Sequence, residues 1–196
     1  VSPMLGTMTF SSGFTNLTGT LELFPGSTLK FPQPLVLAGG VVTGYGTLQA
    51  PAITSSAVID PGATNAVLTI AGNLTQLDNG AMEFDLGGTA PGGNQSQVRV
   101  TGSAQIDGLI GVRYSPGYSP VQGSSHLVLA ASSLKGAFHC FDHFLLLGEN
   151  KRMLAGYSPT NVVLTATAAP DPSGPSLSLF LRDHVLVCWP GEFTNV

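Results

Sequence analysis

The sequence predicts an all-β protein, and within that class a parallel β-helix (a solenoid) with a short C-terminal β-hairpin. Apolar and polar residues alternate in short runs bounded by Gly, Pro, Asn or Asp, which is the pattern of half-buried strands. Pro-Gly pairs recur along the chain, and Gly-Thr fragments recur before apolar runs. A β-sandwich is the alternative, because it is built from strands of similar length.

The expected strands follow from these runs in chain order. They are residues 8–10, 21–24, 66–70, 81–86, 98–100, 105–112 and 162–166. We expect the third run to end at the small residues Ala71, Gly72 and Asn73. Turns are expected at the four Pro-Gly pairs, which are 25–26, 61–62, 91–92 and 116–117.

The chain divides into three expected parts. Residues 1–167 form the β-solenoid, and residues 168–176 form a linker, because three prolines and a glycine there would interrupt any strand ladder. Residues 177–196 form a C-terminal segment with two strand-like runs that turn at Arg182 and Asp183.

Composition limits the classes of function. Charged residues make up 9% of the chain, and its net charge is −4. Because there is no basic stripe, we expect no nucleic-acid binding. We also expect no membrane insertion, because no apolar run reaches the length of about 18 residues that a spanning helix needs. The chain begins at Val1 without a basic leader, so we interpret it as an exported protein, or a fragment of one, whose signal has been removed.

Several segments resemble a known group of proteins. Residues 39–48 (GGVVTGYGTL) resemble one repeat of autotransporter-type passenger domains. Later parts of the same proteins are resembled by residues 56–62, 68–74, 98–109, 118–123, 126–130, 136–138 and 157–164. Residues 185–190 resemble a short module of surface proteins from Verrucomicrobia- and Planctomycetes-like bacteria. The resemblance implies export, a right-handed parallel β-helix and a surface or matrix role, and it brings no catalytic residues.

The two cysteines, Cys140 and Cys188, are a candidate disulfide, because an even pair in an exported chain is typical of one. Two buried free thiols are the alternative. In the resembling module the position of Cys188 is more often Ser, and this departure favours the disulfide.

Two clusters carry residue types that could do chemistry. His139, Cys140 and His143 are zinc-ligand types, but a strand would direct His139 and Cys140 to opposite faces, so we expect ordinary surface histidines and no metal site. Glu83 and Asp85 lie two residues apart, so a strand would place both on one face. With no cluster of basic residues near Glu83, we interpret them as a solvated outer face.

No catalytic residue and no cofactor is predicted. The tyrosines and Trp189 could stack on sugars, although packing within the fold is the commoner role of isolated aromatic residues. We therefore expect an extracellular or cell-surface structural protein that pairs with other copies of itself through exposed strand edges, giving a fibre, sheath or surface layer. A carbohydrate-binding adhesin module, with surface glycans as partners, is the first alternative, and a polysaccharide-degrading enzyme is the second.

Overall fold

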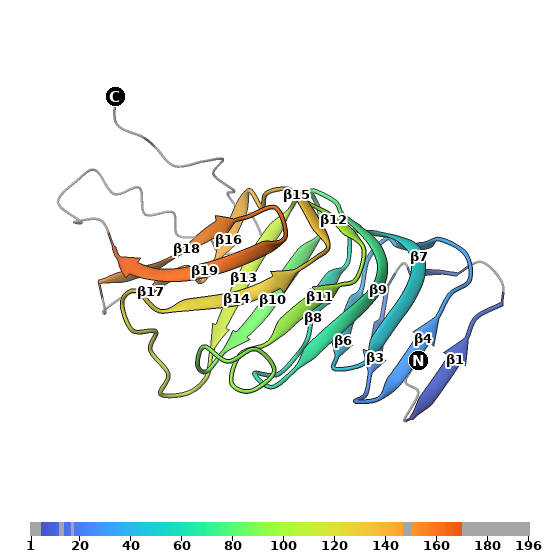
Figure 1. Cartoon of the computed structure of the whole chain (residues 1–196), viewed down its shortest axis with the longest axis horizontal. Helices are drawn as coiled ribbons and strands as arrows, with labels where there is room; N and C mark the ends of the chain where they lie inside the picture. Colours follow the sequence, from blue (N-terminus) through green and yellow to red (C-terminus); the bar gives the residue numbers. More distant parts are fainter. Residues whose placement is uncertain (1–4, 12–13, 17, 147–149, 170–196) are drawn as a thin grey trace.

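The computed structural model describes residues 5–11, 14–16, 18–146 and 150–169, and in these ranges the chain is all-β with no helix. Its strands form two sheets (Figure 1). The six-stranded sheet contains β3 (Thr20–Leu23), β6 (Val41–Gly44), β8 (Val58–Asp60), β10 (Ala81–Leu86), β13 (Leu109–Tyr114) and β16 (Cys140–Asp142). The thirteen-stranded sheet contains β1 (Gly6–Thr9), β2 (Thr15–Asn16), β4 (Ser27–Lys30), β5 (Leu35–Leu37), β7 (Thr47–Ser55), β9 (Val67–Gln76), β11 (Gln97–Val100), β12 (Ser103–Ile106), β14 (Ser125–Ala130), β15 (Ser133–Gly136), β17 (Leu145–Leu146), β18 (Lys151–Tyr157) and β19 (Asn161–Ala168).

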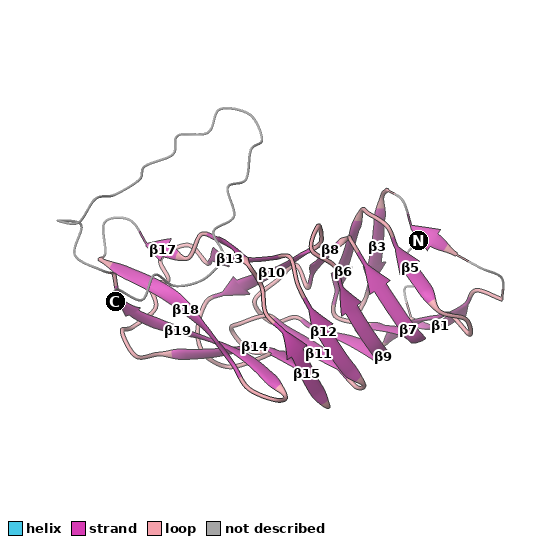
Figure 2. Ribbon diagram, turned by 90° about the horizontal axis from the view of Figure 1, so that it is seen from above, coloured by secondary structure: helices cyan, strands magenta, loops and turns pink. Residues whose placement is uncertain are grey.

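Most strand pairs are parallel, and each parallel pair joins strands that are well separated in the chain. In the six-stranded sheet, Leu21 lies beside Val42, Val42 beside Ile59, and Ile59 beside Met82. The larger sheet branches, because β7 and β9 are long enough to pair with one set of strands along their first halves and with another set along their second halves. The strands consequently lie side by side along the long axis of the molecule (Figure 2).

The core is built from rows of aliphatic side chains that point inward from these ladders. The burial of β10 alternates strictly, with Met82, Phe84 and Leu86 fully buried. The register stacks inward side chains of neighbouring strands on one another, as in the row Leu29, Leu48, Ile70 and Val100. Since burying one such side chain contributes roughly 1.5–3 kcal/mol, these rows are the main source of stability.

The expected turns are confirmed by the backbone. The glycine of each of the four Pro-Gly pairs has a positive φ, between 68° and 83°. A glycine at this position adopts the left-handed conformation without the steric cost that a Cβ atom would add.

Two expected strand boundaries are wrong. The run from residue 66 does not end at Gly72, because β9 continues to Gln76, with a register irregularity opposite Gln49 and Ala52. Gly72 has a φ of 148°, and a Cβ atom there would overlap the carbonyl oxygen of Ala50 on β7. The single expected strand at 105–112 is two strands in different sheets, β12 and β13, because the chain turns at Gly108, whose φ is 83°.

The two ends of the larger sheet differ. At the N-terminal end, β1 pairs among the described strands with β4 alone, and all four of its residues are exposed. The rings of Phe10, Phe14 and Phe31 pack together at centroid distances of 4.8–5.2 Å. At the other end the pairing becomes antiparallel: β14 pairs with β19, β19 with β18, and β18 with β17 (Figure 1).

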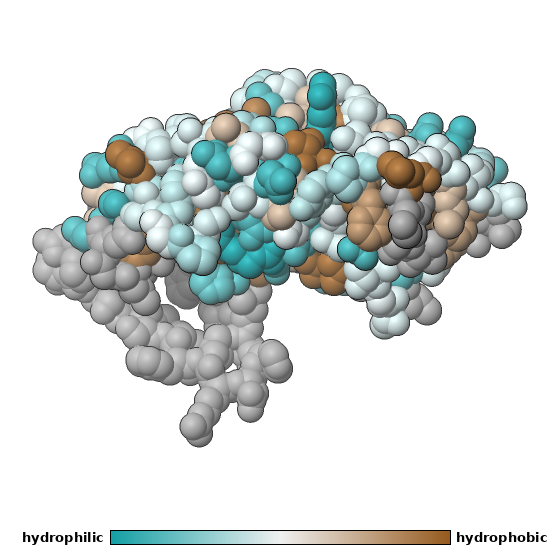
Figure 3. All heavy atoms as spheres, turned by 90° about the horizontal axis from the view of Figure 1, so that it is seen from below, coloured by the Kyte–Doolittle hydropathy of each residue, from teal (hydrophilic) through white to brown (hydrophobic). Residues whose placement is uncertain are grey.

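One face of the molecule is drawn in space-filling form in Figure 3. The face drawn in Figure 3 is mostly neutral to hydrophilic, with small separate hydrophobic spots. Among the described residues, no helix is present that is long and apolar enough to span a membrane. The expected linker and C-terminal hairpin, from residue 170 onward, lie outside the described residues, so that part of the domain prediction stays a prediction.

Candidate functional site

The outer face of the six-stranded sheet carries a row of carboxylates. Glu22 on β3 is in register with Thr43, which is in register with Asp60 on β8. Glu83 on β10 occupies the position after Met82, the partner of Ile59, and therefore lies beside Asp60. Strand alternation directs these side chains outward, because their neighbours along each strand are buried. We call this arrangement the acidic row.

The acidic row continues beyond Glu83. Gly111 on β13 is in register with Glu83 on one side and with Asp142 on β16 on the other. A Cβ atom at Gly111 would lie 3.5 Å from the Glu83 side chain and 3.7 Å from that of Asp142. The two carboxylate side chains therefore lie on either side of Gly111.

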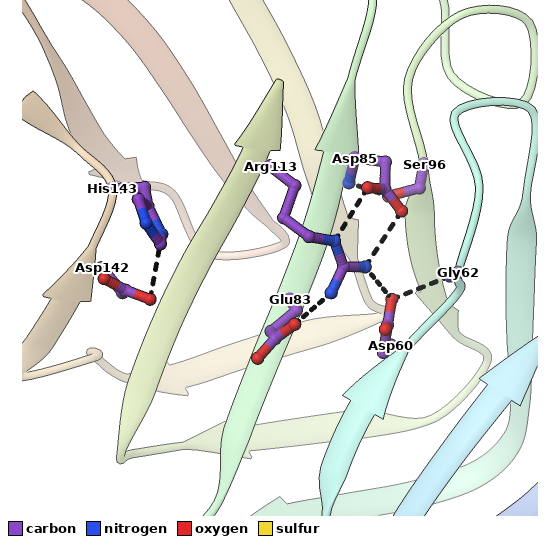
Figure 4. A network of polar contacts seen from close by, with 8 residues as sticks. All are labelled: Asp60, Gly62, Glu83, Asp85, Ser96, Arg113, Asp142 and His143. Atoms are coloured by element: carbon purple, nitrogen blue, oxygen red, sulfur yellow. Dashed lines mark hydrogen bonds and ion pairs between the residues drawn. The ribbon is translucent and has the colours of Figure 1, made fainter. Parts of the chain in front are cut away.

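Arg113 on β13 connects three of the carboxylates (Figure 4). Its Nη2 donates to Asp60 Oδ1 at 2.6 Å and to Asp85 Oδ2 at 3.0 Å, and its Nε donates to Asp85 Oδ1 at 2.9 Å. Its Nη1 donates to Glu83 Oε2. One guanidinium thus bonds to side chains of β8 and β10 from its own strand, β13, and so connects three consecutive strands of the sheet.

Further hydrogen bonds hold Asp60 and the backbone of Asp85. The Gly62 amide donates to Asp60 Oδ1 at 2.8 Å, which holds this side chain against the turn after β8. The backbone amide of Asp85 donates to Ser96 Oγ at 2.8 Å. The Asp60 carboxylate is therefore held by the turn that follows its strand as well as by Arg113.

The charges of the network shift two pKa values. Burial raises the pKa of Glu83 above its ordinary value, Arg113 opposes this, and the neighbouring charges of Asp60, Asp142 and Asp85 raise it further. The hydrogen bonds to Asp85 are the largest cause of a raised pKa of Arg113, so the guanidinium stays charged. The site therefore holds one permanent positive charge among an excess of carboxylates.

The sequence shows no cluster of basic residues near Glu83, but the fold brings one basic residue, Arg113, beside it. Arg113 is separated from Glu83 by 30 positions in the chain, and the parallel register of β10 and β13 brings the two together. The prediction that Glu83 and Asp85 share an outer face is confirmed, since both are paired with the same guanidinium.

The histidines near Cys140 are held in separate pairs. His139 Nδ1 lies 2.7 Å from Asp107 Oδ1, and His143 Nδ1 lies 3.0 Å from Asp142 Oδ2. The backbone amide of Gly108 and then the His139 ring lower the pKa of the exposed Asp107. In the described part of the chain, no three His, Cys, Asp or Glu side chains converge as metal ligands would.

Cys140 is buried, with 3% of its surface exposed, and it lies in β16 beside Leu109. It is not a free thiol in the structure. Cys188 lies outside the described residues, so the pairing of the two cysteines stays a prediction.

The aromatic residues that were candidates for sugar stacking are not gathered on one face. Tyr114 and Tyr118 are partly buried and pack against the core, whereas Tyr45 and Tyr157 are 38% and 39% exposed. Trp189 lies outside the described residues. A carbohydrate-binding role therefore stays a prediction.

Sequence reasoning missed His126, which is fully buried. Its Nδ1 lies 2.7 Å from the Gly88 carbonyl and 3.1 Å from Gln95 Oε1, and its Nε2 lies 3.4 Å from the hydroxyls of Tyr118 and Ser124. Burial lowers the pKa of this imidazole. The ring joins the loop after β10 to the loop after β13, and nothing in the local sequence around His126 signals that role.

Charge is divided between the two sheets. All carboxylates that lie in strands, five in number, are in the six-stranded sheet, which has Arg113 as its single Lys or Arg. The strands of the thirteen-stranded sheet contain no Asp or Glu and carry five cations, which are Lys30, Arg99, Lys135, Lys151 and Arg152.

No protein-family model matches the chain, and no curated protein matches it in sequence. The resemblance to autotransporter-type passenger domains therefore stays a prediction that rests on residues 39–48 and the later segments.

Proposed function

We propose that the chain is an extracellular structural protein, that its sheets wind as a right-handed parallel β-helix, and that it pairs with other copies through the open strand edges at its N-terminal end. The β-helix is supported by strands that alternate between the sheets and pair in parallel with strands one circuit later. Face-to-face sandwiches are usually antiparallel, and here antiparallel pairing is confined to β14 and the strands after it. Export is supported by the low content of charged residues and the paired number of cysteines.

The open N-terminal end is the observation that carries the proposal. Met8 on β1 is in register with Leu29, and it therefore begins an inward row whose other members are buried, yet Met8 is 38% exposed. Leu5, the residue before β1, is 82% exposed. An edge strand with unpaired backbone groups and exposed apolar side chains is a template for pairing with another chain.

The opposite end of the larger sheet is built differently. Its parallel ladder stops at β14, where β19 and β18 continue in the antiparallel sense. One open end leads to a pair of molecules joined end to end, because a fibre requires two complementary ends. A sheath or surface layer therefore needs a second kind of contact.

Analytical ultracentrifugation of the whole chain tests the end-to-end pair. The wild type is expected to form a dimer in a concentration-dependent manner, and Met8→Lys is expected to prevent it by placing a charge at the open end of the core row. Val121→Lys is the matched control, because it also replaces an exposed apolar residue, 72% exposed, with lysine. A wild type that is monomeric at all concentrations up to about 100 μM, where specific pairs with micromolar affinity would associate, would contradict the proposal. Equal dimerisation of Met8→Lys and wild type, with circular dichroism showing both folded, would place any contact elsewhere.

A further inference from the structure

We propose that the acidic row binds a second copy of this chain through the cationic face formed by β4 and β11, so that molecules associate side by side. This inference rests on the proposed structural function and supplies the lateral contact that a layer requires. It does not depend on the open N-terminal end.

The cationic face is defined by Lys30 on β4 and Arg99 on β11. Both side chains are exposed, and neither forms an ion pair with a described residue. Arg99 is in register with Thr69 on β9, which is in register with Thr47 on β7, and Lys30 is in register with Gln49 on β7. Two unpaired cations on a sheet without carboxylates attract an anionic partner.

A hollow beside Arg99 could receive a carboxylate. It has a volume of about 340 Å³ and is lined by Arg99, Val100, Thr101, Ala130, Ala131 and Ser132. The guanidinium and the two hydroxyls can donate hydrogen bonds, and a guanidinium binds a carboxylate through two of its N–H groups.

The acidic row supplies the complementary partner. Its carboxylates outnumber Arg113, so negative charge remains after Arg113 has paired with Asp60, Glu83 and Asp85. The raised pKa of Glu83 reflects in part the mutual repulsion that a further cation would relieve.

The spacing of charges along the two faces is similar. Lys30 and Arg99 are on β4 and β11, which are three strand positions apart in the order β4-β7-β9-β11. Glu22 and Glu83 are on β3 and β10, which are also three positions apart, in the order β3-β6-β8-β10. Because neighbouring strands lie about 4.8 Å apart, both separations are about 14 Å across the strands. Arg99 is in addition displaced by two residues along the strands from the row of Lys30. Two molecules with aligned axes can thus bring cations opposite carboxylates.

A contact between two different faces of the same molecule is heterologous and continues from copy to copy. Each molecule uses its cationic face for one neighbour and its acidic row for the next. The result is an open lateral array, which the end-to-end contact alone cannot produce.

The test uses the full chain carrying Met8→Lys, so that end-to-end pairing does not contribute. Sedimentation equilibrium in 50 mM NaCl is expected to show association that weakens at least 10-fold in 500 mM NaCl, because exposed charges are screened. Lys30→Gln with Arg99→Gln is expected to weaken it at least 10-fold. Lys135→Glu changes the net charge by the same amount but lies on β15, outside the cationic face, and is expected to weaken it less than 3-fold.

Reversing the charges of the cationic face in one variant and of the acidic row in another gives the most direct test. A variant with Lys30→Glu and Arg99→Glu, and a second variant with Glu22→Lys and Asp142→Lys, are each expected not to associate alone. An equal mixture of the two is expected to associate again, since the reversed faces complement each other. The inference is overturned by association that ignores salt, by equal effects of the two charge-matched variants, or by a mixture that stays monomeric while both variants remain folded. The end-to-end pair is tested separately in the native Met8 background, so the two proposals can fail independently.

Discussion

Replacing Arg113 with glutamine removes the one cation of the acidic row and keeps most of the length of the side chain. Arg113 is 41% exposed, and the side chains of Asp60, Asp85 and Glu83 are 17%, 18% and 33% exposed, so solvent screens each pair only in part. A partly exposed ion pair contributes about 0.2–1 kcal/mol. The loss of three such pairs is expected to lower the free energy of unfolding by about 1–3 kcal/mol at pH 7.

The effect of Arg113→Gln should depend on pH in a defined direction. The pKa of Glu83 is already raised above its ordinary value of 4.5, and Arg113 is the neighbour that lowers it. Removing Arg113 raises the pKa further. A carboxyl group whose pKa is higher in the folded state costs nothing while it is protonated, and it destabilises the fold as the pH rises through the folded-state pKa. The deficit of the variant is therefore expected to be largest at pH 7 and to shrink toward pH 3.5.

Urea unfolding followed by circular dichroism between pH 3.5 and pH 7 measures this deficit. Arg99→Gln is the control, because that exposed arginine has no ion-pair partner among the described residues and should change the free energy of unfolding by less than about 0.5 kcal/mol. Equal unfolding midpoints for the two variants at pH 7, or a deficit of Arg113→Gln that is the same at every pH, would refute the assigned role of Arg113.

Three further changes test other parts of the structure. Gly72→Ala is expected to lower the free energy of unfolding by at least about 3 kcal/mol, because the new Cβ atom would overlap a carbonyl oxygen of the neighbouring strand. Gly117→Ala, with a φ of 78° and open space around it, should lower it by about 1–2 kcal/mol. Thermal unfolding of the two variants measures the difference. Because burial lowers the pKa of His126, the wild type should lose stability as the pH falls below about 6.5. Urea midpoints measured from pH 5 to 7.5 should show this loss in the wild type and not in His126→Gln. The same pH dependence of the midpoint in both proteins would contradict the prediction. Peptide mapping without reductant is expected to find Cys140 linked to Cys188, a bridge worth about 4 kcal/mol in the chain-entropy model, and finding both as free thiols would exclude it.

Local sequence patterns predicted the parts of the fold that depend on neighbouring residues. The run at 81–86 alternates without interruption and is a strand with those bounds. The Pro-Gly turns follow from the positive φ that glycine allows. The continuation of β9 through Gly72 could not be predicted, because the reason for a glycine there is the carbonyl oxygen of Ala50, which belongs to a different strand.

In the candidate site, too, features set by neighbouring residues could be predicted and features set by distant residues could not. That Glu83 and Asp85 share a face follows from strand alternation alone. Their pairing with Arg113 depends on the register between two strands, and a shift of one residue would have turned Arg113 inward. The role of His126 could not be predicted either, because its hydrogen-bond partners come from two loops that only the folded chain brings together.

The antiparallel pairing of β18 and β19 has a consequence for how the protein folds. Three residues, 158–160, separate these two strands, so they can meet after closing a very short loop. Every parallel pair instead joins strands that are much further apart in the chain, and closing that longer loop costs more conformational entropy. The hairpin is therefore suited to form the nucleus, with later growth proceeding back toward β1. In a chain synthesised from its N-terminus, the segment made last would then organise the segments made first, and β1 would be the final strand to join.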